Sequence, residues 1–283
     1  MLMKIISNRN HFLLTFIMMV TGLAVFCYWQ NNDLVTTKII INNNKIPVPF
    51  NGYKIVQISD LHNKEFGRNQ SKLINLIKNA NPDIIVITGD LISSKDTKID
   101  IAMELIYGAI DIAPVYYVPG NHEAWSAKYA ELTQKLIASG VVILSDKKIQ
   151  ITKEDTSIDL MGLSDPSVSL YGEYQLGKRL NDLVTGDVDS YKILLSHRPD
   201  LIEIYASNKI DLAFTGHAHG GQFRLPIIGG LGAPDQGFFP KYTSGTYTMD
   251  DTTMVVSRGL GKSVIPVRIF NRPEIIIVTL KND

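Results

Sequence analysis

The chain has 283 residues, 45% of them apolar, which is enough for one large domain or two small ones with a sizeable core. Its 28 basic residues balance 28 acidic ones, which argues against a protein that binds nucleic acid through the phosphate backbone, so no nucleic acid partner is expected. The single cysteine, Cys27, excludes an internal disulfide and a thiolate cluster, so any metal site must use oxygen and nitrogen ligands.

The first predicted element is an apolar segment close to the N-terminus. Residues 12–29 contain no charged side chain, and this length is just sufficient to cross a bilayer as a helix. Lys4 and Arg9 precede the segment, so the positive-inside rule places the N-terminus in the cytoplasm and the rest of the chain outside. A signal peptide cleaved near residues 22–24 is one alternative, and a buried core helix is another that the basic flank disfavours. We expect a cell-membrane protein with a single span, an anchor in residues 1–30 and an extracytoplasmic domain.

The rest of the chain divides into a leading part and an α/β domain. Residues 31–52 are predicted to form a linker and a pair of leading strands, because β-branched residues precede a run of asparagines. From Tyr53 to the end, residues 53–283, apolar strands alternate with amphipathic helices. The helices are expected at residues 71–80, 99–112, 127–139, 176–183 and 199–206. The strands are expected at residues 54–58, 84–87, 115–118, 141–144, around 149, and at 158–163, 191–195, 211–215, 253–257, 267–270 and 275–280. The loop at residues 220–245 is too long for a structureless connection, which indicates a functional rim.

Polar residues suited to metal binding follow five of the predicted strands. They are Asp60-x-His62, Gly89-Asp90, Gly120-Asn121-His122-Glu123, Ser196-His197 and Gly216-His217-x-His219. Five of the six histidines therefore follow strand-like runs, and only His11 lies elsewhere. Open α/β sheets bind ligands at the carboxyl ends of their strands, so we expect these residues to share one site.

These five motifs in this order resemble the calcineurin-like metallophosphoesterase superfamily. The N-terminal apolar segment, Ser59-Asp60-Leu61-His62 and Ser257-Arg258-Gly259-Leu260-Gly261 are similar to its bacterial, envelope-associated phosphodiesterase branch. The resemblance implies a four-layer α/β/β/α sandwich of two mixed sheets, preceded by one transmembrane helix. One departure is Asn63-Lys64, which follows His62 where the family pattern has glycine.

The same resemblance implies a centre of two divalent ions, and the oxygen and nitrogen ligands suit Mn, Fe or Zn. Asp60, His62 and His219 are then expected to bind one ion, Asn121, His197 and His217 the other, and Asp90 both. Two such ions and two aspartates leave a charge of about +2, which attracts an anionic phosphoryl group. His122 is expected to be a non-ligand that protonates the leaving oxygen or stabilises the transition state, and Asp90 to bridge the two ions, so these two are the candidate catalytic residues.

Each candidate also has an ordinary structural interpretation. Asp60 and Asp90 are typical strand-end residues, Asn121 suits a turn, and Glu123 suits the start of a helix. For Glu123 we prefer that interpretation, or a role in which it contacts the metal ligands without binding the metal itself.

The sequence therefore predicts a metal-dependent phosphoesterase that uses a metal-activated hydroxide. The preference for diesters is implied by the resemblance alone, and the predicted membrane placement favours a lipid-linked or cell-envelope substrate. Two alternatives are a phosphoprotein phosphatase and a non-catalytic, membrane-anchored metal-binding module.

Overall fold

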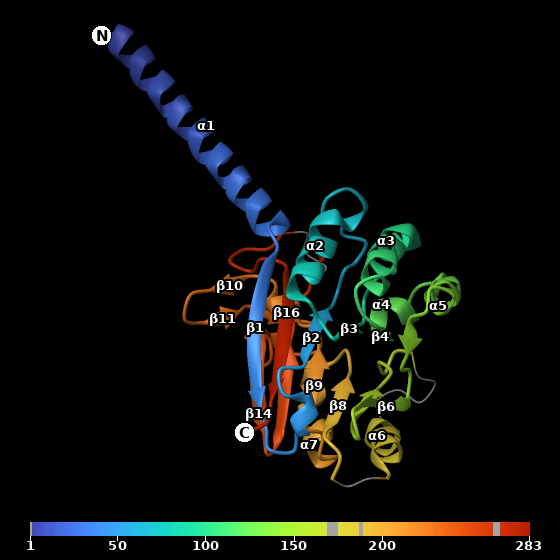
Figure 1. Cartoon of the computed structure of the whole chain (residues 1–283). Coiled ribbons are helices and arrows are strands. Elements are labelled where there is room, and N and C mark those ends of the chain that lie inside the picture. Colours follow the sequence, from blue (N-terminus) through green and yellow to red (C-terminus); the bar gives the residue numbers. More distant parts are fainter. Residues whose placement is uncertain (1, 169–174, 187–188, 263–266) are drawn as a thin grey trace.

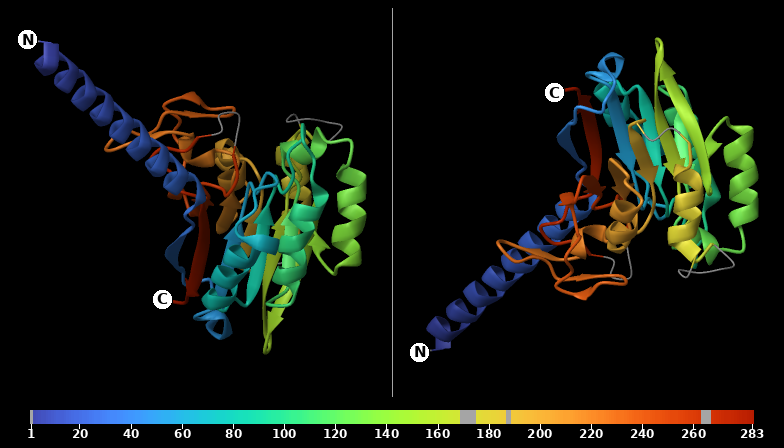
Figure 2. Two further views of the ribbon diagram at one scale, coloured as in Figure 1. Left: turned by 90° about the horizontal axis from the view of Figure 1, so that it is seen from above. Right: turned by 90° about the horizontal axis from the view of Figure 1, so that it is seen from below.

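Two six-stranded sheets lie face to face in the computed structural model, with helices on their outer sides (Figures 1 and 2). The structure describes residues 2–168, 175–186, 189–262 and 267–283, and side chains from residue 10 onward. This arrangement confirms the predicted four-layer α/β/β/α sandwich.

The first sheet has the order β1-β16-β2-β3-β4-β5. Its strands are β1 (Val35–Asn42), β2 (Lys54–Ile58), β3 (Ile84–Thr88), β4 (Val115–Val118), β5 (Val142–Ile143) and β16 (Glu274–Lys281). β16 runs antiparallel to β2, and the other neighbouring pairs are parallel. The first sheet is therefore mixed, as predicted.

The second sheet has the order β14-β15-β9-β8-β7-β6. Its strands are β6 (Lys147–Lys153), β7 (Thr156–Gly162), β8 (Lys192–Leu195), β9 (Leu212–Thr215), β14 (Gly245–Met249) and β15 (Thr252–Val256). The two edge strands, β6 and β14, are antiparallel to their neighbours, and the inner pairs are parallel. Two small hairpins, β10 (Arg224–Leu225) with β11 (Gly229–Gly230) and β12 (Gly232–Ala233) with β13 (Gly237–Phe238), lie in the loop before β14.

Seven α-helices lie in the described part of the chain. They are α1 (Leu2–Asn32), α2 (Ser71–Ala80), α3 (Ile99–Ile110), α4 (Asn121–Ala124), α5 (Tyr129–Ala138), α6 (Leu176–Val184) and α7 (Ile202–Ser207). Apolar residues of α2, α3 and α5 pack on the outer face of the first sheet, and those of α6 and α7 pack on the outer face of the second.

The strand sequences account for this layering. Side chains alternate between the two faces of a strand, and a strand covered on both faces is apolar throughout. In β2, Ile55 faces the core between the sheets and Val56 faces the helices. In β8, Leu195 faces the core between the sheets and Leu194 packs toward α6 and α7.

Helix α1 projects from the folded domain (Figure 1). Its residues Asn10–Asn32 are long and apolar enough to cross a membrane by length and composition, and the most apolar 18 residues among them are not buried inside the protein. The interpretation as a buried core helix is therefore wrong.

The predicted elements mostly occur within a few residues of their expected positions, with three differences. The strand pair expected in residues 31–52 is wrong, because β1 pairs instead with β16, more than 200 residues later. The strand expected at residues 267–270 is also wrong, since this segment forms a single bridge, between Ile269 and Phe223. The expected helix at 199–206 begins as a 3-10 turn, Pro199–Leu201, before α7.

Candidate metal centre

The five predicted motifs lie at the carboxyl ends of β2, β3, β4, β8 and β9, and the structure brings them to one place. Two overlapping groups of buried side chains could each hold a metal ion. The first group is Asp60, His62, Asp90 and His219, and the second is Asp90, His197 and His217. Within each group the ligand atoms lie within 4.8 Å of one another, and Asp90 belongs to both.

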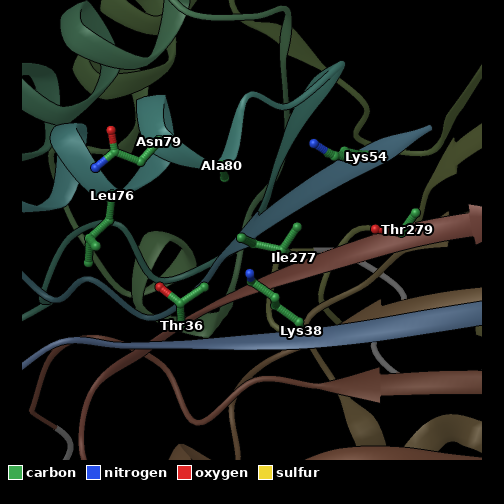
Figure 3. A pocket seen from close by; sticks show the side chains of 8 residues that line it. All are labelled: Thr36, Lys38, Lys54, Leu76, Asn79, Ala80, Ile277 and Thr279. Atoms are coloured by element: carbon green, nitrogen blue, oxygen red, sulfur yellow. The ribbon is translucent and has the colours of Figure 1, made fainter. Parts of the chain in front are cut away.

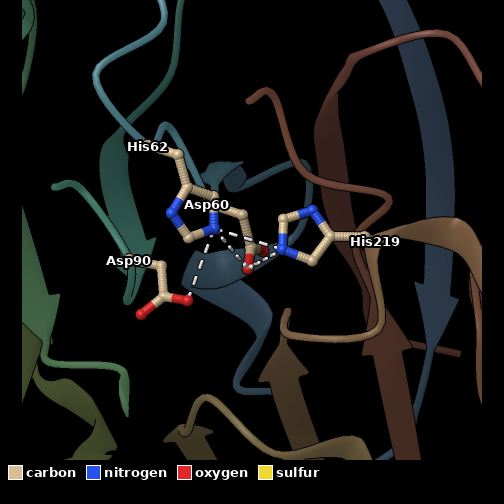
Figure 4. Close-up of side chains that lie close together, drawn as sticks. All are labelled: Asp60, His62, Asp90 and His219. Atoms are coloured by element: carbon tan, nitrogen blue, oxygen red, sulfur yellow. Dashed lines mark hydrogen bonds and ion pairs between the residues drawn. The ribbon is translucent and has the colours of Figure 1, made fainter. Parts of the chain in front are cut away.

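The first group surrounds a small space, as Figure 4 shows. The Nε2 atoms of His62 and His219 are 3.1 Å apart. His219 Nε2 is 3.3 Å from Asp60 Oδ1, and His62 Nε2 is 3.5 Å from Asp90 Oδ2. All four side chains therefore direct a nitrogen or an oxygen toward the same point.

The second group adjoins the first through the Asp90 carboxylate. His197 Nε2 lies 3.3 Å from Asp90 Oδ2, 3.1 Å from Asn121 Oδ1 and 3.1 Å from His217 Nδ1. Asn121, the predicted amide ligand, therefore completes this group.

Backbone and side-chain hydrogen bonds orient these ligands. Nδ1 of His197 lies 2.7 Å from the carbonyl oxygen of Thr88, to which an Nδ1–H donates, so that Nε2 can present its lone pair to the centre. The Ser59 hydroxyl donates to Asp60 Oδ2 at 2.5 Å, and the backbone N–H of His217 lies 3.2 Å from both Asp60 carboxylate oxygens. The rings and carboxylates are thus held in position by the protein itself.

The backbone at the site is strained. Five of the predicted ligands adopt positive φ angles that side chains other than glycine rarely take: Asp60 (52°), His62 (46°), Asp90 (54°), His217 (63°) and His219 (47°). Such conformations cost on the order of 1–3 kcal/mol each and persist only where the surroundings impose them. Asn63, the departure from the family pattern, also has a positive φ, of 57°, which asparagine tolerates better than most residues. The turn therefore forms without the glycine.

Two glycines are required by close approach. A Cβ on Gly216 would lie 1.9 Å from Ser59 Oγ and 2.5 Å from Asp60 Oδ2. A Cβ on Gly120 would lie 2.3 Å from Asp90 Oδ1. The glycines in these motifs thus make room for the two carboxylates.

Burial controls the protonation of the site. It lowers the pKa of His62 to about 3 and holds the pKa of His219 well below its usual range, so both imidazoles are neutral near pH 7. Burial also raises the pKa of Asp60 to about 6. Burial opposes the charged forms of Asp90 and His197, but their mutual attraction prevails, so the pKa of Asp90 falls well below its usual range and that of His197 rises to about 10.

The donor set fits two divalent cations. The Nε2 atoms of His62 and His219 face each other at 3.1 Å, a spacing at which the two neutral rings either share one proton or direct both lone pairs to one cation. Likewise, a cation beside Asp90 would replace the proton that this carboxylate otherwise induces on His197. The ligand atoms are nitrogen and oxygen only, which suits Mn, Fe and Zn.

His122 lies beside the centre without belonging to either group of ligands. Its ring centroid is 4.5 Å from that of His62, and its backbone N–H donates to Asp90 Oδ1 at 2.9 Å. The backbone N–H of Ser94 donates to His122 Nδ1 at 3.2 Å, so the neutral ring carries its proton on Nε2. Burial lowers the pKa of His122, which favours this neutral form.

Glu123 has the supporting position that the sequence favoured. Its carboxylate accepts backbone N–H groups from Asp90 at 2.8 Å, Gly120 at 2.8 Å and Ile92 at 3.2 Å. Burial raises the pKa of Glu123 to about 8, while these three donors favour its ionised form. The side chain thus ties the loop after β3 to the start of α4.

Sequence reasoning missed Asp235, which lies in the long loop before β14. Its Oδ2 is 2.8 Å from His217 Nε2 and also bonds Arg198, whose Nε donates to Asp165 at 2.7 Å. A carboxylate that accepts from the distal nitrogen of a ligand histidine fixes the ring orientation. No local motif marks Asp235, because it reaches the site only through the path of the loop.

The Ser257–Gly261 stretch also has a structural explanation. The backbone N–H of Gly261 donates to the Asp60 carbonyl at 2.6 Å, and that of Leu260 lies 3.2 Å from the same oxygen. A Cβ on Gly259 would lie 2.7 Å from the Asp60 Cβ. This stretch therefore packs on the turn that carries Asp60, which explains why it accompanies the ligand motifs.

A pocket of about 490 Å³ lies elsewhere, beside the outer face of the first sheet (Figure 3). It is lined by Thr36, Lys38, Lys54, Leu76, Asn79, Ala80, Ile277 and Thr279. None of the predicted ligands lines it, so the candidate centre is defined by its ligand geometry rather than by this pocket.

Known proteins are similar to this chain over most of its length. A family model described as calcineurin-like phosphoesterase matches residues 53–221. The chain is 30% identical over 263 residues to the uncharacterized metallophosphoesterase YkuE of Bacillus subtilis, which covers 90% of this chain and 88% of that protein.

Two further relatives differ in length and description. A transmembrane protein with metallophosphoesterase domain from Danio rerio is 29% identical over 247 residues, which cover 84% of this chain and 55% of that protein. The phosphodiesterase YaeI of Escherichia coli is 24% identical over 233 residues, which cover 81% of this chain and 82% of that protein.

Proposed function

The chain belongs to the calcineurin-like phosphoesterase family and is a metal-dependent phosphoric ester hydrolase, and from this premise we propose that it is a phosphodiesterase acting outside the cytoplasmic membrane. Its cofactors are two divalent metal ions. We propose the following ligands: Asp60, His62 and His219 for one ion, Asn121, His197 and His217 for the other, and Asp90 for both.

The position of Asp90 carries this assignment. Its Oδ2 atom is 3.5 Å from the first group, at His62 Nε2, and 3.3 Å from the second, at His197 Nε2. One carboxylate between two clusters of imidazoles is the arrangement that a pair of adjacent cations requires, because the shared negative charge offsets their repulsion. When bound, the two ions supply positive charge for the phosphoryl oxygens and lower the pKa of coordinated water.

His122 is proposed to stabilise the leaving oxygen by donating a hydrogen bond to it from Nε2. The Ser94 N–H occupies Nδ1, so the neutral ring carries its proton on Nε2 and can donate this hydrogen bond without a change of tautomer. The bond from the His122 backbone to Asp90 fixes this ring relative to the proposed centre.

Two observations support the finer substrate class. A relative that covers most of the chain is named a phosphodiesterase. Helix α1 is long and apolar enough to span a bilayer, and another relative is named a transmembrane protein. We propose a single span with the catalytic domain on the extracytoplasmic side, because Lys4 and Arg9 precede the apolar segment, and a lipid-linked or envelope phosphate ester as substrate.

A comparison of substrates tests the proposal. The full chain in detergent, supplied separately with Mn, Fe, Zn or Co, should hydrolyse an aryl phosphodiester faster than an aryl phosphomonoester or a phosphopeptide. Faster turnover of the phosphopeptide would favour a phosphoprotein phosphatase. Failure with every ester and every metal would favour a binding module.

A further inference from the structure

The long loop before β14 exposes several large apolar side chains. They are Leu225, Ile227 and Ile228, at or beside the tip of hairpin β10–β11, and Phe238 and Phe239, at the open end of hairpin β12–β13. Ile227 is fully exposed and Phe238 is 88% exposed. Single exposed apolar residues are ordinary, but a group of this kind marks an interaction surface. We call these five side chains the apolar rim.

The apolar rim lies on the same side of the domain as α1. Figures 1 and 2 show the β10–β13 segment beside the domain end of this helix in all three views. That end carries the exposed aromatic residues Tyr28 and Trp29, which are typical of the boundary between lipid and water. Phe270 is 54% exposed and lies beside α1, with its ring centroid 5.5 Å from that of Phe26. Its neighbour Ile269 forms a bridge with Phe223, next to β10.

Hydrogen bonds join the helix firmly to the domain. The side-chain oxygen of Asn31 accepts the backbone N–H of Arg268 at 3.1 Å, and that of Gln30 accepts the N–H of Asn271 at 3.2 Å. Both α1 side chains are buried. The β10–β11 hairpin is attached to the same segment, residues 268–271, because the backbone N–H of Arg224 donates to the Ile269 carbonyl at 3.0 Å. Helix and hairpin are thus fixed relative to each other.

We propose that the apolar rim docks onto the surface of the same bilayer that α1 crosses, at the level of the lipid headgroups. The proposal rests on the proposed membrane insertion of α1. The bilayer is the occupant that the contacts favour, since the rim adjoins the apolar helix and is held rigidly to its last turn.

The hairpin segment has a small excess of positive charge, which suits binding to the phosphates of a lipid surface. Residues 222–245 contain two basic residues, Arg224 and Lys241, and one acidic residue, Asp235. Asp235 is engaged with His217 and Arg198, whereas Lys241 is exposed, and its ammonium, 4.9 Å from the Tyr242 ring centroid, lies where headgroup phosphates can reach it.

Docking would also set the height of the metal centre above the bilayer. The Asn271 amide donates to the His219 carbonyl at 2.7 Å and to the Gln222 carbonyl at 3.1 Å. The segment that holds the end of α1 therefore also holds the loop of a proposed metal ligand.

Spin labelling of the full chain in phospholipid nanodiscs tests the proposal. In a Cys27→Ser background, single cysteines are placed at Ile228 and Phe238 in the rim, at Ile17 in α1, and at Asp155, an exposed turn residue between β6 and β7. Each carries a nitroxide, and its collision rates with oxygen and with a water-soluble nickel chelate are measured. All four sites are exposed in the folded protein, so the labels leave the core intact.

The ratio of oxygen to nickel collisions should be highest at position 17 in the bilayer interior, lowest at 155 in water, and intermediate at 228 and 238 at the headgroup level. A label at 17 in lipid, with 228 and 238 as accessible to nickel as 155, would overturn the docking and leave the anchor. A label at 17 in water would overturn the insertion of α1, and the docking with it.

Discussion

His62 and His219 are 157 residues apart in sequence, and their Nε2 atoms lie 3.1 Å from each other. Both rings are buried and neutral near pH 7, so two lone-pair-bearing nitrogens can converge on the space bordered by Asp60 and Asp90. This relationship is the basis for predictions about metal content.

Substitution His219→Ala should remove one of the two ions, because the first group loses a nitrogen ligand while the second keeps all of its own. The metal-to-protein ratio after dialysis, measured by plasma mass spectrometry, should fall from about two to about one. His11→Ala, at the histidine in α1, is the matched control and should keep both ions. A ratio of two in the His219 variant would contradict the assignment.

Substitution Asp90→Asn should have a larger effect, since this carboxylate lies within 3.5 Å of a histidine in each group. Asparagine keeps the volume but removes the charge that offsets the repulsion between two cations. We expect loss of both ions, against loss of one in Asp60→Asn, which belongs to the first group only. Equal metal content in the two variants would show that Asp90 is not shared.

Substitution His122→Ala should separate chemistry from metal binding. His122 is outside both ligand groups, so metal content should remain at that of the unmodified protein. Loss of a positioned hydrogen-bond donor to the leaving oxygen should lower kcat by about two to three orders of magnitude on an ester with a poor leaving group. An activated aryl leaving group stabilises its own negative charge and should show a smaller loss. A fall in metal content as well would mean that His122 is a ligand.

The sequence pattern was sufficient for most strands and for the ligands that follow neighbouring strands of one sheet, whereas the four layers were implied by the family resemblance. The carboxyl ends of parallel neighbours meet at one edge, so Asp60 and Asp90, which follow β2 and β3, could be placed together without a structure. His197 follows β8 of the second sheet, and only the packing of the two sheets brings it to this edge. Local periodicity likewise located α2 at the residues expected.

Contacts that depend on chain path could not be predicted in this way. β1 contains no signal that its partner is β16, because parallel pairing over such a separation depends on the whole topology. Asp235 sits in an irregular loop, and only the folded path brings its carboxylate to His217. The segment at 267–270 has strand-like residues, but packing against α1 and β10 leaves it a single bridge.

Substitution Gly216→Ala should destabilise the protein and disturb the Asp60 side chain. The added methyl group would lie 1.9 Å from Ser59 Oγ and 2.5 Å from Asp60 Oδ2, so one of these groups must move. Overpacking of this kind costs about 1–3 kcal/mol in the free energy of unfolding. Gly177→Ala in α6 is the matched control, since its Cβ would meet nothing within 4 Å. Denaturant titration should show a loss for the first variant and no loss for the second.

Substitution Asp235→Asn should weaken the second metal site without removing a proposed ligand. The carboxylate lies 2.8 Å from His217 Nε2, and it keeps Nδ1, the other ring nitrogen, turned toward His197. Loss of such a carboxylate lowers metal affinity about ten- to a hundredfold. Calorimetric titration of the metal-free protein with Mn should show one weakened site and one unchanged site. Asp251→Asn, on the exposed turn between β14 and β15, should leave both affinities intact. Two unchanged sites in the Asp235 variant would show that the contact does not orient His217, and two weakened sites would show that the loop supports the whole centre.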